Sequence, residues 1–414
     1  MAEQEHTREH QQGQPSMQNE SVDLAIVGGG LAGALTAWRI AETRPDVKIA
    51  LIEQGETLGG NHTWSFHESD VPSEIASWLD KLVVHSWPRQ EVRFPKHTRT
   101  LETGYRSITS ERLHDVVAPA LGDRLILGVR AADVDADGVT LEDQRRIKAR
   151  AVLDVRGQRG NDALTLGFQK FLGQEIRFKK PHGVTTPIIM DATVSQSDGY
   201  RFVYVLPFSE NVALIEDTYY ADGASLDRDK LRQQIKTYCA DKGWEIQDVL
   251  REEEGILPIA LAGDIDAHLE DGVDGVSMGG LSAGLFHPLT GYSLPDAARL
   301  ADLVANASDV SGSALFSLTR AHAKKRWSDR AFYRMLSRFL FYAARPDGRH
   351  KVLQRFYRLP PKLIERFYSS GSTNADKLRV LVGKPPVSFL KAIQSVNEKH
   401  WRDYCWAPGQ NAAE

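Results

Sequence analysis

After a polar opening stretch, the chain shows two short apolar runs separated by a glycine-rich turn and a longer mixed segment. The β-branched run at 23–27 predicts a buried strand, and the run at 48–52 predicts a second one. Between them lies a helical pattern that Pro45 ends, and Glu53 closes the second strand. The turn before the helix holds the glycines of a GxGxxG motif, Gly28, Gly30 and Gly33. This order of elements predicts a Rossmann-like dinucleotide-binding fold.

Two further glycine-rich segments favour FAD as the dinucleotide. Gly59 and Gly60 come just after the acid that ends the second strand, where FAD-binding folds lead the chain back over the pyrophosphate. Near the other end, 280–305 is a glycine-rich loop that leads into an Ala/Leu-rich helix, and the N-terminus of that helix would face the flavin. An ordinary loop before a helix is the alternative interpretation of that segment.

The expected cofactor contacts are of two kinds. Backbone N–H groups at the start of the first helix favour the pyrophosphate, and the acid at the end of the second strand accepts hydrogen bonds from ribose hydroxyls. The predicted cofactor-binding residues are Gly28, Gly30, Leu31, Ala32, Gly33, Glu53, Gly59, Gly60, Asn61, His62, Gly284, Gly291, Tyr292 and Ser293.

The middle of the chain changes to strand patterns at 187–194, 199–207 and 211–220, and the last two form a hairpin around a turn at 209–211. The third strand contains adjacent carboxylates, Glu216 and Asp217. Successive side chains of a strand point to opposite faces, so the two cannot enter one cavity unless a bulge intervenes. We expect one to face the cofactor and substrate, and the other to be held by hydrogen bonds or a cation such as Arg201. An ion pair on a half-exposed sheet face is the alternative.

A helix at 227–243 and a strand at 254–263 then lead back to the nucleotide-binding part. The predicted fold class is α/β: a Rossmann-like FAD-binding domain of the glutathione-reductase or hydroxylase type, an inserted antiparallel-sheet substrate domain and a helical C-terminal region. The predicted domains are a disordered polar tail at 1–20, a discontinuous FAD-binding domain at 21–160 and 277–310, a substrate domain at 161–276, and a helical region at 311–414. The assignment of parts of 61–105 to the FAD-binding domain or to the substrate domain stays open.

Composition agrees with a soluble enzyme, because 42% of the residues are hydrophobic and 26% are charged. The sequence contains no apolar run near the about 20 residues that a membrane-spanning helix needs. The first twenty residues lack the hydrophobic block of a secretory signal. Cys239 and Cys405 are the two cysteines, which offers neither a disulfide framework nor a metal site and fits a reducing cytosol.

The net charge of −4 conceals a strongly basic segment. The range 320–366 holds fourteen Lys or Arg residues against three acids, together with many aromatic residues. Four arginines recur at every fourth position along one helical flank: Arg326, Arg330, Arg334 and Arg338. Such a helix is typical of peripheral membrane contact, while a solvated charged face is the alternative. Nucleic-acid binding fits poorly beside a flavin site.

Several motifs together resemble the bacterial lycopene β-cyclases. They are GGNHTWSFH (59–67), LVVHSWPRQEVRFP (82–95), GYRSITSERL (104–113), TPIIMDATV (186–194), GYRFVYVLP (199–207), LIEDT (214–218), AGLFHPLTGYSLP (283–295) and GKPPV (383–387). The resemblance runs in order over roughly 21–395, and GGNHTWSFH, LIEDT and FHPLTGYSLP are close to family-specific. One departure is Val155, which stands where we expect a glycine.

The resemblance implies a flavin enzyme without net redox change. Its substrates would be lycopene and related carotenoids, with FAD active in its reduced form and NAD(P)H as reductant. The glutamate of LIEDT would be the acid–base residue, which falls on Glu216, with Asp217 in support. The expected substrate pocket has aromatic walls from Trp64, Phe66, Tyr204 and Phe286, with His62 and His287 as candidate proton relays or else structural histidines. No metal or nucleic acid is expected. We expect a cytoplasmic protein on the inner face of the cell membrane, with other enzymes of the carotenoid pathway as candidate partners.

Two other functions remain open from the residues. A redox flavoprotein, such as an aromatic hydroxylase or a prenyl reductase, shares this order of elements but would consume NAD(P)H in each turnover. A carotenoid- or flavin-binding protein without catalysis is the third candidate. A carboxylate facing a hydrocarbon pocket argues against it, because a binder has no use for that charge.

Overall fold

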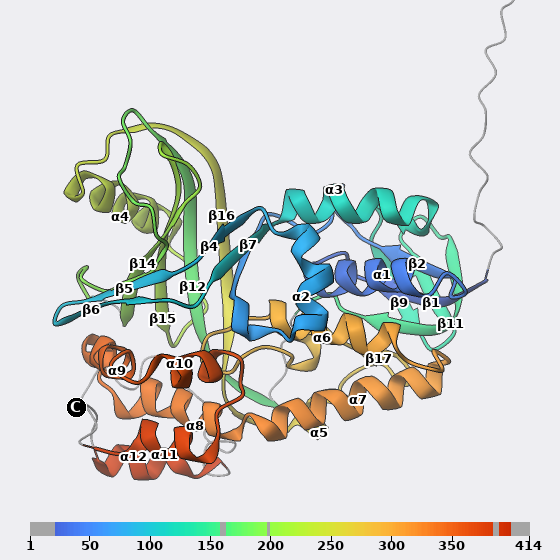
Figure 1. The fold of residues 1–414 in the computed structure, drawn as a ribbon. Coiled ribbons are helices and arrows are strands. Elements are labelled where there is room, and N and C mark those ends of the chain that lie inside the picture. Colours follow the sequence, from blue (N-terminus) through green and yellow to red (C-terminus); the bar gives the residue numbers. More distant parts are fainter. Residues whose placement is uncertain (1–20, 158–162, 197–198, 384–388, 399–414) are drawn as a thin grey trace, which may run out of the picture.

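The computed structural model describes residues 21–157, 163–196, 199–383 and 389–398. The predicted tail at 1–20 and Cys405 lie outside these residues. Figure 1 shows the Rossmann-like part on one side, a second sheet on the other, and the C-terminal helices beneath both. The α/β fold class is confirmed. The division into domains at the stated boundaries stays a prediction.

The first sheet has the order β8–β2–β1–β11–β10–β9, with β17 paired to β11. Its parallel strands are β8 (Leu125–Ile126), β2 (Ile49–Ile52), β1 (Ser21–Val27), β11 (Arg146–Asp154) and β17 (Ser277–Met278). An antiparallel hairpin of β9 (Ala131–Asp135) and β10 (Gly138–Leu141) extends one edge. The strands predicted at 23–27 and 48–52 are therefore confirmed as neighbours in a parallel sheet.

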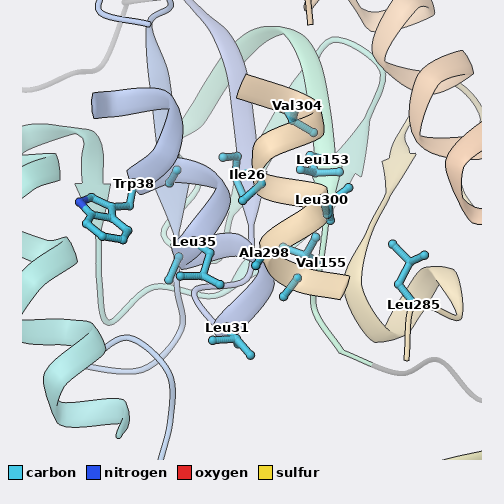
Figure 2. Packing of buried hydrophobic residues seen from close by; sticks show 14 of the residues in the cluster. Ile26, Leu31, Leu35, Trp38, Leu153, Val155, Leu285, Ala298, Leu300 and Val304 are labelled. Atoms are coloured by element: carbon cyan, nitrogen blue, oxygen red, sulfur yellow. The ribbon is translucent and has the colours of Figure 1, made fainter. Parts of the chain in front are cut away.

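Helices α1 (Leu31–Thr43) and α6 (Leu294–Ala305) pack together on one face of this sheet, where α3 (Ser110–Leu121) joins them. Figure 2 shows Ile26 and Leu153 of the sheet in one cluster with Leu35 of α1 and Leu300 of α6. This contact brings the two predicted ends of the nucleotide-binding part, far apart in sequence, side by side. The core therefore fixes the N-termini of both helices at the same end of the sheet.

The second sheet has the order β16–β12–β15–β14–β13–β5–β6. Its bounds are β5 (Gln90–Phe94), β6 (His97–Leu101), β12 (Leu164–Phe178), β13 (Ile188–Asp191), β14 (Tyr200–Pro207), β15 (Val212–Ala221) and β16 (Ile246–Gly263). The β14–β15 hairpin is as predicted. Sequence reasoning missed β12, a long strand between β15 and the edge strand β16. The β5–β6 hairpin joins this sheet through β13.

The remaining elements frame the two sheets. A small sheet of β3 (Thr63–His67), β7 (Tyr105–Thr109) and β4 (His85–Trp87) lies between the two large sheets in space (Figure 1). Helix α4 (Arg228–Asp241) covers the outer face of the second sheet. The remaining helices before the C-terminal region are α2 (Ser73–Leu79) and α5 (Ile265–Glu270).

The C-terminal region is helical, as predicted. It comprises α7 (Gly312–Asp329), α8 (Ala331–Arg338), a π-helical turn (Phe339–Ala343), α9 (Arg349–Phe356), α10 (Pro361–Tyr368), α11 (Asn374–Leu381) and α12 (Phe389–Val396). Within the described ranges, each helix is too short or too polar to cross a lipid bilayer.

The burial of the arginine flank in this region corrects the prediction that it forms a membrane-facing or solvated surface. Arg330, Arg334 and Arg338 are buried, and so they form neither a membrane-facing nor a solvated surface. Arg330 pairs with buried Asp296 at the start of α6, with 2.6 Å between Nη1 and Oδ2. Arg338 donates to the backbone carbonyl of Ser395 at 2.6 Å. A periodic basic pattern cannot reveal such partners, because the acids and carbonyls come from distant parts of the chain.

Candidate active site

A cavity of about 860 Å³ lies between the two large sheets. One side is formed where parallel strands of the first sheet end, at Gly28, Glu53 and Val155. The other side is the inner face of the second sheet, including Tyr204 and Glu216. Ligands of doubly wound sheets bind at the carboxyl ends of their strands. The cavity therefore joins a nucleotide site to a second, chemically different wall.

The nucleotide end of the cavity fits a pyrophosphate. Gly30 is the N-cap of α1, no side chain caps that end, and its first turn carries no acid. A Cβ placed on Gly30 would meet nothing within 4 Å, so the glycine leaves open space at the helix start. Free N–H groups and the helix dipole favour an anion there. Leu31 and Ala32 line the same space, and their contact with a cofactor stays a prediction.

Gly33 has a different task from the cavity-lining glycines. A Cβ on Gly33 would lie 1.9 Å from the carbonyl oxygen of Gly28, so it allows α1 to pack against the turn. Glu53 fastens the same turn: its Oε2 accepts from the Gly29 N–H at 2.6 Å, and its Oε1 accepts from the Gly55 N–H at 2.7 Å. Glu53 also lines the cavity.

The other predicted cofactor residues divide into two groups. Gly59, Gly60, His62, Gly291, Tyr292 and Ser293 line the cavity. Two others are not among its lining residues. Asn61 donates from Nδ2 to the Glu252 carbonyl at 2.6 Å, and a Cβ on Gly284 would touch Ile265 and Trp327. Taken together, the glycine turn, the acid and the second helix start are suited to hold an FAD.

Strand alternation separates Glu216 from Asp217, as predicted. Glu216 lines the cavity, whereas Asp217 lies on the face covered by α4, where Ala213 and Ile215 of the same strand pack. Asp217 forms a buried bidentate pair with Arg201, with 2.6 Å between Oδ2 and Nη2 and 2.9 Å between Oδ1 and Nε. Burial raises the pKa of Asp217, and the Arg201 guanidinium opposes that rise.

Glu216 is a carboxyl group in the cavity that is still protonated near neutral pH. Burial, with a smaller contribution from the negative charge of Glu253, raises its pKa from 4.5 to about 8. The Thr218 hydroxyl donates to Oε1 of Glu216 at 2.6 Å and fixes the side chain. A carboxyl group with such a pKa is suited to general acid catalysis.

Glu253 is a functional candidate that sequence reasoning missed. Gly173 of β12 pairs with Glu216 on one side and with Glu253 on the other, so both carboxylates lie on one face. A Cβ on Gly173 would come within 3.4 Å of both side chains. Burial raises the pKa of Glu253 to about 7, although Arg251 and Thr63 donate to its Oε2 at 2.7 and 2.9 Å.

A sequence signal for Glu253 did exist. It is the middle residue of the run Glu252–Glu253–Glu254 in β16, and alternation separates it from its neighbours. Glu252 pairs with Arg232 and Glu254 pairs with Arg228. The triplet therefore contains two paired acids at the surface and one acid turned inward.

Three tyrosine hydroxyls connect the walls of the cavity. The Tyr105 hydroxyl lies 2.8 Å from that of Tyr204 and 3.1 Å from that of Tyr292. Burial raises the pKa of each of these phenols well above 10, so all three stay neutral and act as hydrogen-bonding groups. Their rings, with that of Trp64, give the cavity aromatic faces that can attract a cation.

Three predicted pocket residues are not among the lining residues. Phe66 and Phe286 lie in the core of the first sheet. His287 is buried beside the C-terminal helices, where its Nε2 lies 3.3 Å from the Phe367 carbonyl. Burial lowers the pKa of His287 to about 3, so the ring is neutral at pH 7. The structure therefore favours the structural interpretation of His287.

The fold and the cavity define a class, the two-sheet flavoprotein fold. A geranylgeranyl bacteriochlorophyll reductase-like protein from Thermoplasma acidophilum superposes with a TM-score of 0.58 at 13% identity, covering 91% of this chain and 98% of that one. A flavin-dependent brominase superposes with a TM-score of 0.57 at 13% identity, covering 92% and 100%. At this identity the likeness shows the fold alone.

The sequence specifies the family. The chain belongs to the lycopene cyclase protein family, whose pattern matches residues 23–394. It is 48% identical to the lycopene beta-cyclase of Pantoea ananas, covering 91% of this chain and 98% of that protein. It is 46% identical to the lycopene beta-cyclase of Paracoccus sp., covering 91% and 97%.

Proposed function

We propose that the protein cyclises the open ends of lycopene to β-ionone rings, giving γ-carotene and then β-carotene. The observation that carries this proposal is Glu216, a buried carboxyl group with a pKa of about 8 that faces an aromatic cavity beside a nucleotide cradle. The family membership supports it. A redox hydroxylase or reductase activity is not favoured, because the closely related proteins are cyclases.

The reaction needs one proton in and one proton out for each ring. The Glu216 O–H would donate its proton to the terminal double bond, which leaves a tertiary cation on the substrate. The π electrons of the neighbouring C5=C6 bond then form the ring bond and move the positive charge into the ring. Loss of the C6 proton to the Glu216 carboxylate restores both the double bond and the acid, so product and substrate are isomers.

The surroundings of Glu216 suit both halves of this cycle. Desolvation keeps the carboxyl group protonated before the substrate reacts, and the adjacent Glu253 charge opposes its ionisation. The faces of Tyr204 and Trp64 would stabilise the cation without capturing it. When bound in the cradle, FAD in its reduced, anionic form would supply negative charge near the cation, and NAD(P)H would keep it reduced.

We place the protein at the inner face of the cell membrane, where its lipid-soluble substrate is found. The basis is an exposed apolar surface on α11 and α12 that includes Leu378, Leu381, Leu390 and Ile393. This surface replaces the buried arginine flank as the expected membrane contact. Apolar side chains on short helices bind the interfacial region of a bilayer without spanning it.

The test is expression in a lycopene-accumulating bacterial host with chromatography of the pigments. The wild-type protein is expected to deplete lycopene, and Glu216→Gln is expected to reduce cyclisation by about 10²- to 10⁴-fold, the usual contribution of a general acid. Glu254→Gln, which changes an exposed acid of the second sheet, is the matched control and should cyclise normally. Lycopene that persists beside folded, flavin-loaded wild-type protein would refute the proposal.

A further inference from the structure

A second cavity of about 330 Å³ lies among the C-terminal helices, beside the active-site cavity. Four residues line both spaces: Met190, Tyr220, Thr290 and Tyr368. Tyr220 belongs to β15, the strand that also carries Glu216. The two cavities therefore adjoin at the Tyr220 and Tyr368 side chains, where a polyene chain would have to pass from one to the other.

The walls of the second cavity suit a hydrocarbon. Half of its lining residues belong to α8, the π-helical turn, α9 and α12, including Leu336, Phe339, Leu353, Phe356 and Ile393. The two tyrosine hydroxyls at the boundary are already satisfied: Tyr220 donates to the Leu289 carbonyl at 3.0 Å, and Tyr368 hydrogen-bonds with Tyr357. A nonpolar ligand would thus leave these two polar groups paired.

The size of the cavity and its irregular wall are also those of a ligand site. Its volume lies at the lower end of the roughly 300–1,000 Å³ range of ligand pockets. The π-helical turn Phe339–Ala343 contributes Phe339 and Leu340 to the wall. Such turns occur frequently at functional sites, because they shift side chains out of the regular helical register.

The second cavity also reaches the apolar surface of the last helices. Leu381, Ile393 and Val396 line the cavity and are exposed at the same time. The second cavity therefore lies between the active-site cavity and the surface where we expect the bilayer. A lipid-soluble chain would lie against apolar side chains here, and a bilayer would cover the exposed end of the cavity.

We infer that the second cavity binds the far end of the polyene while the near end lies beside Glu216. This inference rests on the proposed function and deepens it. Lycopene has two identical ends and is cyclised twice. During the first cyclisation the far end is a slim open chain, and during the second it is a bulky ring. The second cavity would therefore decide how readily γ-carotene goes on to β-carotene.

The experiment fills the second cavity after the protein has folded. Ala392 on α12 lines the cavity and is partly exposed, so Ala392→Cys offers a thiol for N-benzylmaleimide. Cys239 is buried and burial raises the pKa of its thiol to about 12, so it stays unreactive at neutral pH. Cys405→Ser provides the background. The matched control is Ala375→Cys on α11, an exposed residue outside the cavity.

The measurement is the ratio of γ-carotene to β-carotene formed from lycopene in vesicles by protein with a mass-verified label. Labelled Ala392→Cys is expected to form γ-carotene within about twofold of the unlabelled rate, while its conversion to β-carotene falls about fivefold or more, the usual penalty of overpacking an apolar site. The labelled control should keep the wild-type ratio. Ala392→Phe provides the same test without chemistry.

The other outcomes overturn the inference. An unchanged product ratio after complete labelling would mean that the cavity takes another occupant, such as a lipid tail or the chain segment 399–414. An equal loss of both steps would mean that the cavity has no selective contact with the far end. If the unlabelled protein forms neither carotene, the proposed function itself fails and the inference falls with it.

Discussion

Glu216 and Glu253 form a pair in which each carboxyl group affects the proton affinity of the other. They share one face of the second sheet across Gly173, which has no side chain to separate them. The charge of Asp217 also raises the pKa of Glu216. Burial and the charge of Glu111 raise the pKa of Glu253, and Arg251 is the cation that opposes this rise.

The first prediction concerns Glu253→Gln. Cyclisation needs protonated Glu216, so the rate should fall as the pH rises through the Glu216 pKa of about 8. Removing the nearby negative charge lowers that pKa and moves the fall to lower pH. We expect the rate at pH 8 to drop by roughly 3- to 10-fold, and the rate at pH 6.5 to stay within about twofold. The measurement is the pH profile of lycopene turnover.

The control for this change is Glu175→Gln. Glu175 contacts Arg251 at 3.4 Å, so its removal perturbs the same arginine without altering the acid beside Glu216. It should leave the profile nearly unchanged. A Glu253→Gln profile that keeps its alkaline limb, or shifts it upward, would contradict the coupling.

At the scale of elements, β15 connects the two faces of the second sheet. Its inner face presents Glu216 to the cavity, and its outer face holds the Asp217–Arg201 pair beneath α4. We predict that Asp217→Asn lowers the free energy of unfolding by about 3–5 kcal/mol, because it leaves a buried guanidinium without its charge partner. Chemical denaturation followed by circular dichroism measures this change.

The exposed pair between Arg228 and Glu254 is the comparison for that experiment. Arg228→Gln is expected to leave the free energy of unfolding nearly unchanged, because solvent screens exposed ion pairs. Any Asp217→Asn protein that folds should show a smaller downward shift of the alkaline limb than Glu253→Gln, because Asp217 raises the pKa of Glu216 less than Glu253 does. A larger shift with unchanged stability would instead assign Asp217 to the chemistry.

The turn between β1 and α1 gives a prediction about the cofactor. Gly30→Val places a side chain in space that is open in the protein, so the cofactor-free fold should melt at the wild-type temperature. Flavin affinity should fall about tenfold or more, since the side chain displaces the phosphate from charged hydrogen bonds worth about 1.5–3 kcal/mol each. Flavin absorbance after reconstitution measures the loss.

The control for this change is Gly223→Val, at another glycine with open space around it, which should bind flavin normally. Full flavin binding by Gly30→Val would instead mean that the pyrophosphate binds elsewhere.

At the scale of the whole molecule, local patterns were enough to predict the elements that build the site. The GxGxxG turn and Glu53 lie where the spacing put them, and alternation along β15 separated Glu216 from Asp217. Contacts between distant segments were beyond local patterns. Strand β12 contains Gly167 and Gly173, which obscure its apolar alternation. The acid that pairs with Arg330 in the arginine flank, Asp296, belongs to a different helix, α6. Phe286 and His287 failed as pocket residues for the same reason: motif membership does not tell which way a side chain points.

The measurement that tests the central claim most directly is the mass of the product formed in heavy water. Purified protein with reduced FAD would convert lycopene in vesicles prepared in D₂O, followed by chromatography and mass spectrometry. If Glu216 exchanges its proton with solvent between turnovers, γ-carotene carries one deuterium and β-carotene carries two, while the products made in ordinary water have the mass of lycopene. Products that gain oxygen, or that gain or lose a pair of hydrogens, would contradict an acid–base cyclisation. They would show that the protein catalyses a redox reaction instead.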